Sequence, residues 1–110
     1  MSLPTDAQER KRTPIYSGVI RYFPDVWPEV AKVSWKGNEQ HNPGQPLHWS
    51  RGKSNDHMDC AVRHIFDHAD NPLDTDESYH LAKAIWRLAA ELQLLLEAKD
   101  ERSDNEAHTV

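Results

Sequence analysis

Apolar residues recur at helical spacing in three separate parts of the chain. In the first part, three valines lie on one helical face: Val26, Val30 and Val33. Asp25 precedes them and can cap a helix, and Gly37 follows where helices often end on glycine. The pattern predicts a first helix over residues 25–36.

The second part carries a clearer stripe. Five apolar residues fall at i, i+3, i+4, i+7 and i+8: Met58, Ala61, Val62, Ile65 and Phe66. Ser54 or Asn55 can cap a helix that begins just before them. We therefore predict a second helix over residues 55–68, with this stripe as the face that packs into the core.

The third part has the longest stripe: Leu81, Ile85, Leu88, Leu92 and Leu95. Asp74, with Glu77 three residues later, has the pattern of a capping box, so we predict a third helix over residues 75–98. Because only the short segment ADNPL separates the second and third helices, they should pack as an antiparallel hairpin. The predicted fold class is all-α, a small helical bundle.

The rest of the chain lacks such stripes. Residues 1–13 and 99–110 mix charges with few large apolar side chains, as flexible tails do, which leaves a single helical domain over residues 14–98. This domain begins with a short stretch, residues 14–23, that we expect to be extended. A long polar loop, GNEQHNPGQPLHWSRGKS over residues 37–54, then separates the first and second helices and suits neither a helix nor a strand.

Composition disfavours several classes of protein. The 110 residues carry a formal net charge of −5 without a block of like charge, so general nucleic-acid binding is not expected. No apolar run approaches the roughly 20 residues that cross a bilayer, so no membrane partner is expected either. The only cysteine, Cys60, cannot form an internal disulfide, and no signal segment opens the chain. A cytoplasmic location fits best.

The length of the chain bears on its assembly. A domain of this size buries roughly two-thirds of its unfolded surface, so its own core is modest. The helices offer more apolar stripe than such a chain can cover from all sides. We therefore expect a homodimer or homotetramer, with Leu92, Leu95 and Leu96 as interface positions.

Metal-ligand side chains gather where the second helix meets the third. On a wheel of about 100° per residue, three histidines lie within roughly 40° of one another: His57, His64 and His68. In the hairpin, His64 and His68 approach Asp76, Glu77 and His80. The acids favour Mg²⁺ or Mn²⁺, and the histidine spacing does not match a closed zinc site. The alternative is a capped helix start with polar neighbours and no ion.

A second acidic candidate lies on the other flank of the second helix. Asp56 and Asp59 have the spacing of a paired-carboxylate metal motif. Asp59, Arg63 and Asp67 also follow one another at i, i+4, which is typical of a solvated helix face with ion pairs. Both interpretations remain open at the level of sequence.

Cations suited to phosphate lie beside these acids. Lys83 and Arg87 are one turn apart on the third helix, and the polar loop adds Arg51 and Lys53. Trp49 in the loop can stack on a nucleotide base, or can anchor the loop to the core.

Several segments together resemble one known family. They are YFPD, GNEQHNPGQPLHW, RGKSND, the pair Arg63-His64, DTDESYH and AKAIWRLAAELQ, within residues 14–97. They resemble the N-terminal domain of the phage dATP/dGTP diphosphohydrolases, which is similar to the MazG-like all-α nucleotide pyrophosphohydrolases. Where many members of that family have a second histidine and an asparagine, this chain has Lys83 and Arg87.

The resemblance implies an enzyme that cleaves a purine deoxynucleoside triphosphate to monophosphate and pyrophosphate, with Mg²⁺ or Mn²⁺. A phage origin would place it in the host cytoplasm. With the pattern of residues, it implies metal ligation by Asp76 and Glu77 with help from Asp59 or His80, and proton relay by His64 or His80. Six residues are expected to bind the substrate: Trp49, Arg51, Lys53, Arg63, Lys83 and Arg87.

A protein without catalytic activity is the alternative. The same polar loop would suit a phage accessory or adaptor protein that binds a nucleotide or a protein partner. Stabilisation by dATP or dGTP that depends on metal would distinguish the enzyme from the adaptor.

Overall fold

The computed structural model describes the backbone of residues 3–108 and the side chains of residues 3–102. Over this part of the chain there are four α-helices and one short π-helical segment, without a strand. A single isolated antiparallel bridge pairs Leu73 with Tyr79. The predicted all-α fold class is therefore confirmed. No helix among the described residues is long and apolar enough to cross a membrane.

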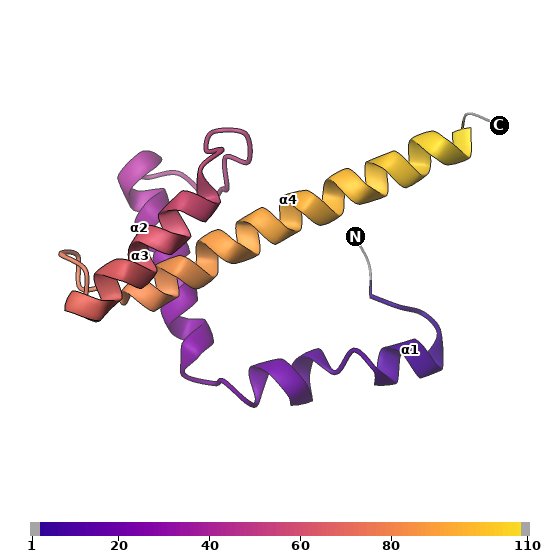
Figure 1. The fold of residues 1–110 in the computed structure, drawn as a ribbon, viewed down its shortest axis with the longest axis horizontal. Helices are drawn as coiled ribbons and strands as arrows, with labels where there is room; N and C mark the ends of the chain where they lie inside the picture. The colour runs from indigo at the N-terminus through magenta and orange to yellow at the C-terminus, as the bar shows by residue number, and fades with distance from the viewer. Residues whose placement is uncertain (1–2, 109–110) are drawn as a thin grey trace.

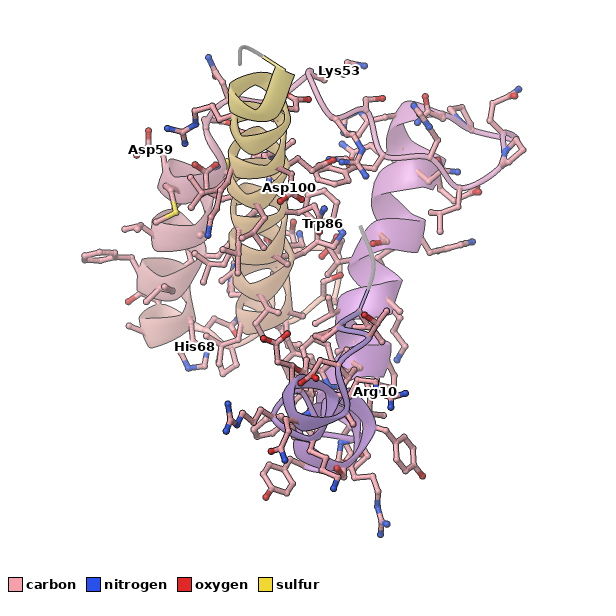
Figure 2. The ribbon with its side chains drawn as sticks, turned by 90° about the vertical axis from the view of Figure 1, so that its right-hand side faces the viewer. Arg10, Lys53, Asp59, His68, Trp86 and Asp100 are labelled. Carbon is pink, nitrogen blue, oxygen red and sulfur yellow. The ribbon has the colours of Figure 1, made fainter. Side chains whose placement is uncertain are left out.

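Three helices form the bundle: α2 (Val26–His41), α3 (His57–Asp70) and α4 (His80–His108). The long helix α4 packs against both of the others, and Figure 2 shows α3 on one side of it and α2 on the other. His57 lies against Arg87 and His64 against His80, so α3 and α4 run in opposite directions. Beyond the bundle α4 continues alone (Figure 1).

The N-terminal part differs from the prediction of a tail followed by an extended stretch. It holds α1 (Ala7–Lys11) and the π-helical segment η1 (Tyr16–Ile20), which lie apart from α3 in Figure 1. Asp6 caps α1 by accepting a hydrogen bond from the Glu9 backbone N–H, and η1 follows Pro14, which suits the start of a helix. Neither segment buries a residue, so local hydrogen bonds hold them.

The first main helix is longer than predicted. Asp25 makes no side-chain cap, and Gly37 lies inside α2, which continues to His41. The reason is Asn38, a buried residue whose side chain anchors the polar loop. Its Nδ2 donates to the Gln45 carbonyl at 2.9 Å, and its Oδ1 accepts from the His48 N–H at 3.2 Å. These bonds offset the cost of a glycine within a helix, about 1 kcal/mol.

The third main helix starts later than predicted and ends later. The predicted capping box at Asp74 and Glu77 is wrong, because residues 74–79 form a turn and α4 begins at His80. In that turn, Asp76 Oδ1 accepts from the Ser78 N–H, and Glu77 has a left-handed φ of 67°. At its other end α4 runs through the segment predicted as a C-terminal tail. Residues 1–2 and 109–110 of the predicted tails lie outside the described residues.

The core contains small side chains. Among residues 3–102, the buried hydrophobic residues are all alanines: Ala61, Ala82, Ala84 and Ala90. The predicted core face of α3 is therefore wrong except at Ala61. Met58, Val62 and Ile65 are 45–49% exposed, and Phe66 is 72% exposed. The helix instead turns its histidine row inward, and the neighbouring alanines allow α3 and α4 to approach closely.

The exposed apolar residues of α3 and α4 share one side of the pair. On a helical wheel of either helix, these residues are rotated by about 60–180° from the side that contacts the other helix, in the direction of increasing residue number. Since the two helices are antiparallel, the same rotation on both points to the same side of the pair, and α2 packs on the opposite side of α4. We call this surface the apolar face. It consists of Met58, Val62, Ile65, Phe66, Leu81, Leu88, Leu92, Leu95 and Leu96.

Candidate functional site

Two histidines meet at the centre of the contact between α3 and α4. His64 Nδ1 lies 3.0 Å from His80 Nδ1, and the side chains are 7% and 6% exposed. Burial, followed by the charges of Arg63 and Lys83, holds the pKa of His64 below its usual value of 6.5. His64 is therefore neutral at pH 7 and can accept a proton or bind a cation.

A carboxylate accompanies this pair. Asp67 lies one turn after His64 on α3, and one ligand atom from each of His64, Asp67 and His80 lies within 4.8 Å of the other two. In the part of the chain with described side chains, this is the one group of three or more such residues that could hold a metal ion. Asp67 is exposed, whereas the histidines are buried.

Beside the histidines, a lysine is held between two acids. Lys83 Nζ lies 2.7 Å from Asp74 Oδ2 and 3.2 Å from Asp76 Oδ2. From α2, Lys36 Nζ donates to the Asp76 carbonyl and to Ser78 Oγ. The turn before α4 is therefore fixed by two lysines from two helices, and both of its aspartates already have a cationic partner.

The ion pairs shift the pKa values of these groups. The hydrogen bond from Lys83 and the one from the Thr75 N–H lower the pKa of Asp74 to about 2. Burial alone would raise the pKa of Asp76, but bonds from the Ser78 N–H and Lys83 outweigh it and lower that pKa. For Lys83, burial is outweighed by its bonds to Asp74 and Asp76, so its pKa rises. All three groups are charged at neutral pH.

The residues predicted as metal ligands do not come together. Asp76 is bonded to Lys83, and Glu77 is exposed in a turn with a left-handed backbone. Asp59 lies in the first turn of α3, at the end opposite to His68, as Figure 2 shows. His80, predicted to assist them, faces His64 instead. The oxygen-rich cluster predicted from the sequence is thus divided between separate places.

The predicted phosphate ligands on the helices are also separated. Lys83 belongs to the acid pair near His80, whereas Arg87 lies one turn further along α4. There Arg87 Nη1 lies 3.2 Å from His57 Nδ1 and 3.9 Å from Asp56 Oδ1. Arg63 is exposed, and its Nη2 lies 3.5 Å from His64 Nε2. Among the predicted phosphate-binding cations, Arg63 is therefore the exposed one that lies beside the histidine pair.

The polar loop places its aromatic residue against the bundle. The Trp49 and Trp86 rings meet edge to face with centroids 5.9 Å apart, and Trp86 Nε1 donates to Ser34 Oγ. Arg51 stacks on Trp49, with Cζ 4.4 Å from the ring centroid, and pairs with Glu97. Trp49 and Arg51 therefore anchor the loop to α4. Lys53 is exposed at the end of the loop (Figure 2).

A surface depression between the loop and α4 does not suit a triphosphate. It is lined by Arg51, Gln93, Glu97, Asp100 and Glu101. Three of these residues are acids, and the only cation among them is paired with Glu97. Like charge repels a polyanion, so this depression is unrelated to the chemistry of the histidine pair.

Sequence reasoning missed three parts of this site. Asp67 stands three residues after His64, and that spacing is a usable signal for a shared ligand group. Asp74 carries only a capping signal in the sequence. Lys36 has no local signal, because its contact with Asp76 spans 40 positions and exists only after α2 packs on α4.

The chain matches the model of a known protein family. The family model described as dATP/dGTP diphosphohydrolase, N-terminal, matches residues 4–104. A search of curated proteins and a search of solved structures each found no match. Since the match covers both the helical bundle and the polar loop, this chain belongs to the dATP/dGTP diphosphohydrolase N-terminal family.

Proposed function

We propose that this chain hydrolyses a purine deoxynucleoside triphosphate, dATP or dGTP, to the monophosphate and pyrophosphate. The observation that carries the proposal is the match of the diphosphohydrolase family over residues 4–104. The buried pair His64 and His80, beside the cations Arg63 and Lys83, gives that activity a candidate centre.

The divalent ion implied by the resemblance does not fit the acids predicted for it. Asp76 is paired with Lys83, and neither Glu77 nor Asp59 belongs to the group around His64. We therefore derive no step through these acids. In enzymes of this kind a bound Mg²⁺ or Mn²⁺ lowers the pKa of a water and polarises the phosphate.

The histidine pair supports the transfer of a proton. Hydrolysis to monophosphate requires water to attack the α-phosphorus, so that the bond to the bridging oxygen breaks and pyrophosphate leaves. A neutral His64, with its lowered pKa, can take the proton of that water, and the contact of 3.0 Å can pass it to His80. Burial keeps both rings in position for this role.

Cations around the pair support binding of the leaving group. Arg63 is exposed next to His64, so its guanidinium can turn to a phosphate oxygen and form two parallel hydrogen bonds. Lys53, at the end of the polar loop, lies away from the end of α3 that carries His68 (Figure 2), so it is a candidate for another part of the nucleotide. Lys83 and Arg87 already have acidic neighbours. They therefore act on the triphosphate mainly through the electrostatic potential near the histidine pair, and not by direct hydrogen bonds.

The polar loop is the candidate for base recognition. Arg51 stacks on the ring of Trp49, and the ring also packs edge to face against Trp86. We therefore assign Trp49 the role of holding the loop in place. The amides of Asn38 and Asn42 already bond within the loop, so the side chains of Gln40 and Gln45 are its candidates for the base edges, which offer both donors and acceptors. Loops commonly carry such groups on a rigid helical frame.

The experiment that tests the proposal is a panel of nucleoside triphosphates incubated with Mg²⁺ or Mn²⁺. Pyrophosphate and phosphate are measured separately. We expect pyrophosphate from dATP or dGTP at a rate well above that from pyrimidine substrates. Release of phosphate alone would place the cleavage at another bond, and absence of both products with either metal would reject the activity.

An accessory role without catalysis is a second candidate. It is favoured by the depression beside α4, which is exposed and acidic and so suits a cationic partner better than a nucleotide. An adaptor would show no stabilisation by dATP or dGTP that requires metal, whereas an enzyme with 100-fold excess of ligand over Kd would gain about 2.7 kcal/mol. A thermal shift series with and without metal separates the two.

We also propose that the apolar face is covered by a second copy of the chain. The face runs along both α3 and α4 and contains large aliphatic residues at 41–59% exposure together with Phe66. Few monomeric proteins leave such a continuous apolar surface in water. Pairing two α3–α4 hairpins through this face would produce a four-helix arrangement, and a dimer of such dimers would be a tetramer.

A further inference from the structure

Two buried ring nitrogens face each other in the contact between α3 and α4. His64 Nδ1 and His80 Nδ1 are 3.0 Å apart, and both residues are more than nine-tenths buried. If both nitrogens carried a proton, the two N–H groups would point at each other and clash at this distance. The contact therefore holds either one shared proton or a cation bound to both rings.

The spacing fits two ligands of one metal ion. Bonds from imidazole to a divalent metal are about 2.0–2.1 Å, so two nitrogens on adjacent corners of an octahedron lie about 3.0 Å apart. On a tetrahedron they lie about 3.4 Å apart. The observed separation agrees with the first geometry without any movement of the helices.

A third ligand is in reach. An oxygen of Asp67 lies within 4.8 Å of one ring nitrogen of each histidine, and the side chain is exposed, so it can rotate toward the pair. His64 and Asp67 are one turn apart on α3, while His80 comes from α4. An ion bound there would tie the two helices together.

We propose that His64, Asp67 and His80 form a binding site for a divalent transition-metal ion such as Mn²⁺, Co²⁺ or Zn²⁺. Two imidazoles and one carboxylate suit these ions, whereas Mg²⁺ prefers oxygen ligands in an octahedral shell that keeps several waters. Three protein ligands also leave coordination positions open, as in catalytic metal sites, so that a water or a phosphate oxygen can bind.

The neighbouring acids do not compete for the ion. Asp74 and Asp76 flank Lys83 Nζ at 2.7 Å and 3.2 Å, so an ammonium group already occupies the position between them. The charge of Asp74 still lies near the histidine pair, since its Oδ2 is 3.9 Å from His80 Nδ1. It therefore partly balances the positive charge of a metal without binding it directly.

One existing contact would change on binding. Arg63 Nη2 lies 3.5 Å from His64 Nε2, and since a guanidinium only donates, this contact needs an unprotonated Nε2. A His64 that binds metal through Nδ1 carries its proton on Nε2, so the two donors would oppose each other. Arg63 is exposed and can turn into solvent or to a phosphate of the substrate.

The site would supply the divalent ion for the proposed hydrolase and in that respect rests on the proposed function. A bound ion would occupy Nδ1 of both histidines and so replace the proton relay between them. Binding of the metal alone, however, is measured without any nucleotide. A chain that binds Co²⁺ at this site but releases no pyrophosphate would retain the metal site and lose the proposed function. A chain that releases pyrophosphate with Mg²⁺ but does not bind Co²⁺ at this site would retain the proposed function and lose the metal site.

The test is a titration of the full chain with Co²⁺, followed by visible absorption and by the NMR signals of the histidine rings. Asp67→Asn is compared with Asp70→Asn, an exposed aspartate one turn further along α3. Neither substitution touches the buried core, so both variants should fold. We expect one Co²⁺ per chain, a weakening of at least tenfold for Asp67→Asn, and a change within twofold for Asp70→Asn.

The ring signals provide the second readout. Those of His64 and His80 should shift or broaden at the first equivalent of Co²⁺, ahead of the signals from the exposed His41 and His48. The proposal is overturned by equal weakening in the two variants, which would indicate diffuse attraction by acids. It is also overturned if Mg²⁺ binds more tightly than Co²⁺, or if Co²⁺ leaves both buried rings unchanged.

Discussion

Asp74 owes the lowering of its pKa mainly to Lys83, which lies nine positions away on α4. The bond from Lys83 Nζ, 2.7 Å long, lowers the pKa of Asp74 from its ordinary value of 3.8 to about 2, although the side chain is 24% exposed. Because the lysine also contacts Asp76, the turn before α4 has a compact charged centre. This centre holds the helix start at which His80 is placed.

The first prediction concerns acid stability. A carboxyl group whose pKa is lowered on folding stabilises the fold above its ordinary pKa, and loses that effect as the pH falls through the lowered value. A shift of a little under two pH units corresponds to about 2 kcal/mol. Asp74→Asn should therefore reduce the free energy of unfolding by about this amount at pH 7, measured in urea.

The same series at low pH separates this cause from packing. Between pH 4 and pH 2 the gap between the parent and Asp74→Asn should shrink, because the parent loses its ion pair. Asp70→Asn serves as the control, with little change at either pH. A gap that stays constant down to pH 2 would contradict the assignment of the stabilisation to the charge of Asp74.

A second prediction concerns Glu77. Its φ of 67° is in the left-handed region, which costs a residue with a Cβ roughly 1–2 kcal/mol and costs glycine almost nothing. Glu77→Gly should raise the free energy of unfolding by about 1 kcal/mol. A decrease on thermal or urea unfolding would show that the glutamate side chain stabilises the turn.

Glu77 also tests whether the turn before α4 is a metal site, as the sequence pattern predicts. Since Glu77 does not belong to the group around His64, Glu77→Gln should leave the release of pyrophosphate within about threefold of the parent, or about 0.7 kcal/mol in barrier. A loss of a hundredfold or more, with the fold intact, would restore Glu77 as a metal ligand.

At the scale of the helices, the apolar periodicity predicted where the helices lie in the sequence, but not where they end or which face of α3 is buried. The stripes of α3 and α4 marked two helices because apolar spacing near 3.6 residues is characteristic of an amphipathic helix. The ends were harder to predict, since Asn38 and the turn at residues 74–79 depend on hydrogen bonds to distant backbone groups. The buried face of α3 was predicted wrongly because an apolar stripe can pack either into the chain's own core or against a second molecule, and the sequence does not distinguish the two.

The candidate site was predictable to a similar degree. His64 and His80 stood out from the sequence because a short link between two helices brings their facing ends together. Pairing within each ion cluster was not predictable. Whether Lys83 serves a phosphate or two aspartates depends on distances that exist only in the folded chain.

The third prediction tests the apolar face at this scale. Val62→Glu on α3 and Leu92→Glu on α4 place a charge in the proposed interface, so each should convert a dimer or tetramer to a monomer at micromolar concentration. Light scattering gives the mass, and circular dichroism shows whether the helices remain. Asp67→Lys, on the flank of α3 opposite to the apolar face, should leave the mass unchanged. A parent chain that is monomeric throughout would reject the proposed assembly.

At the scale of the whole molecule, the described chain is a three-helix bundle with an N-terminal extension. Helix α1 buries no residue, so it contributes little to the core (Figure 1). Removal of residues 1–12 should therefore change the melting temperature by less than about 4 °C, the effect of roughly 1 kcal/mol in a domain of this size. A larger loss would reveal a stabilising contact of this segment in the assembly.

Hydrolysis of dGTP in water enriched in ¹⁸O shows which phosphorus the water attacks. The chain is incubated with dGTP and Mn²⁺, and the products are analysed by mass spectrometry. We predict dGMP with one ¹⁸O atom and pyrophosphate without the label, because water attacks the α-phosphorus. Label in pyrophosphate, formation of dGDP and phosphate, or no turnover of dGTP or dATP would contradict it.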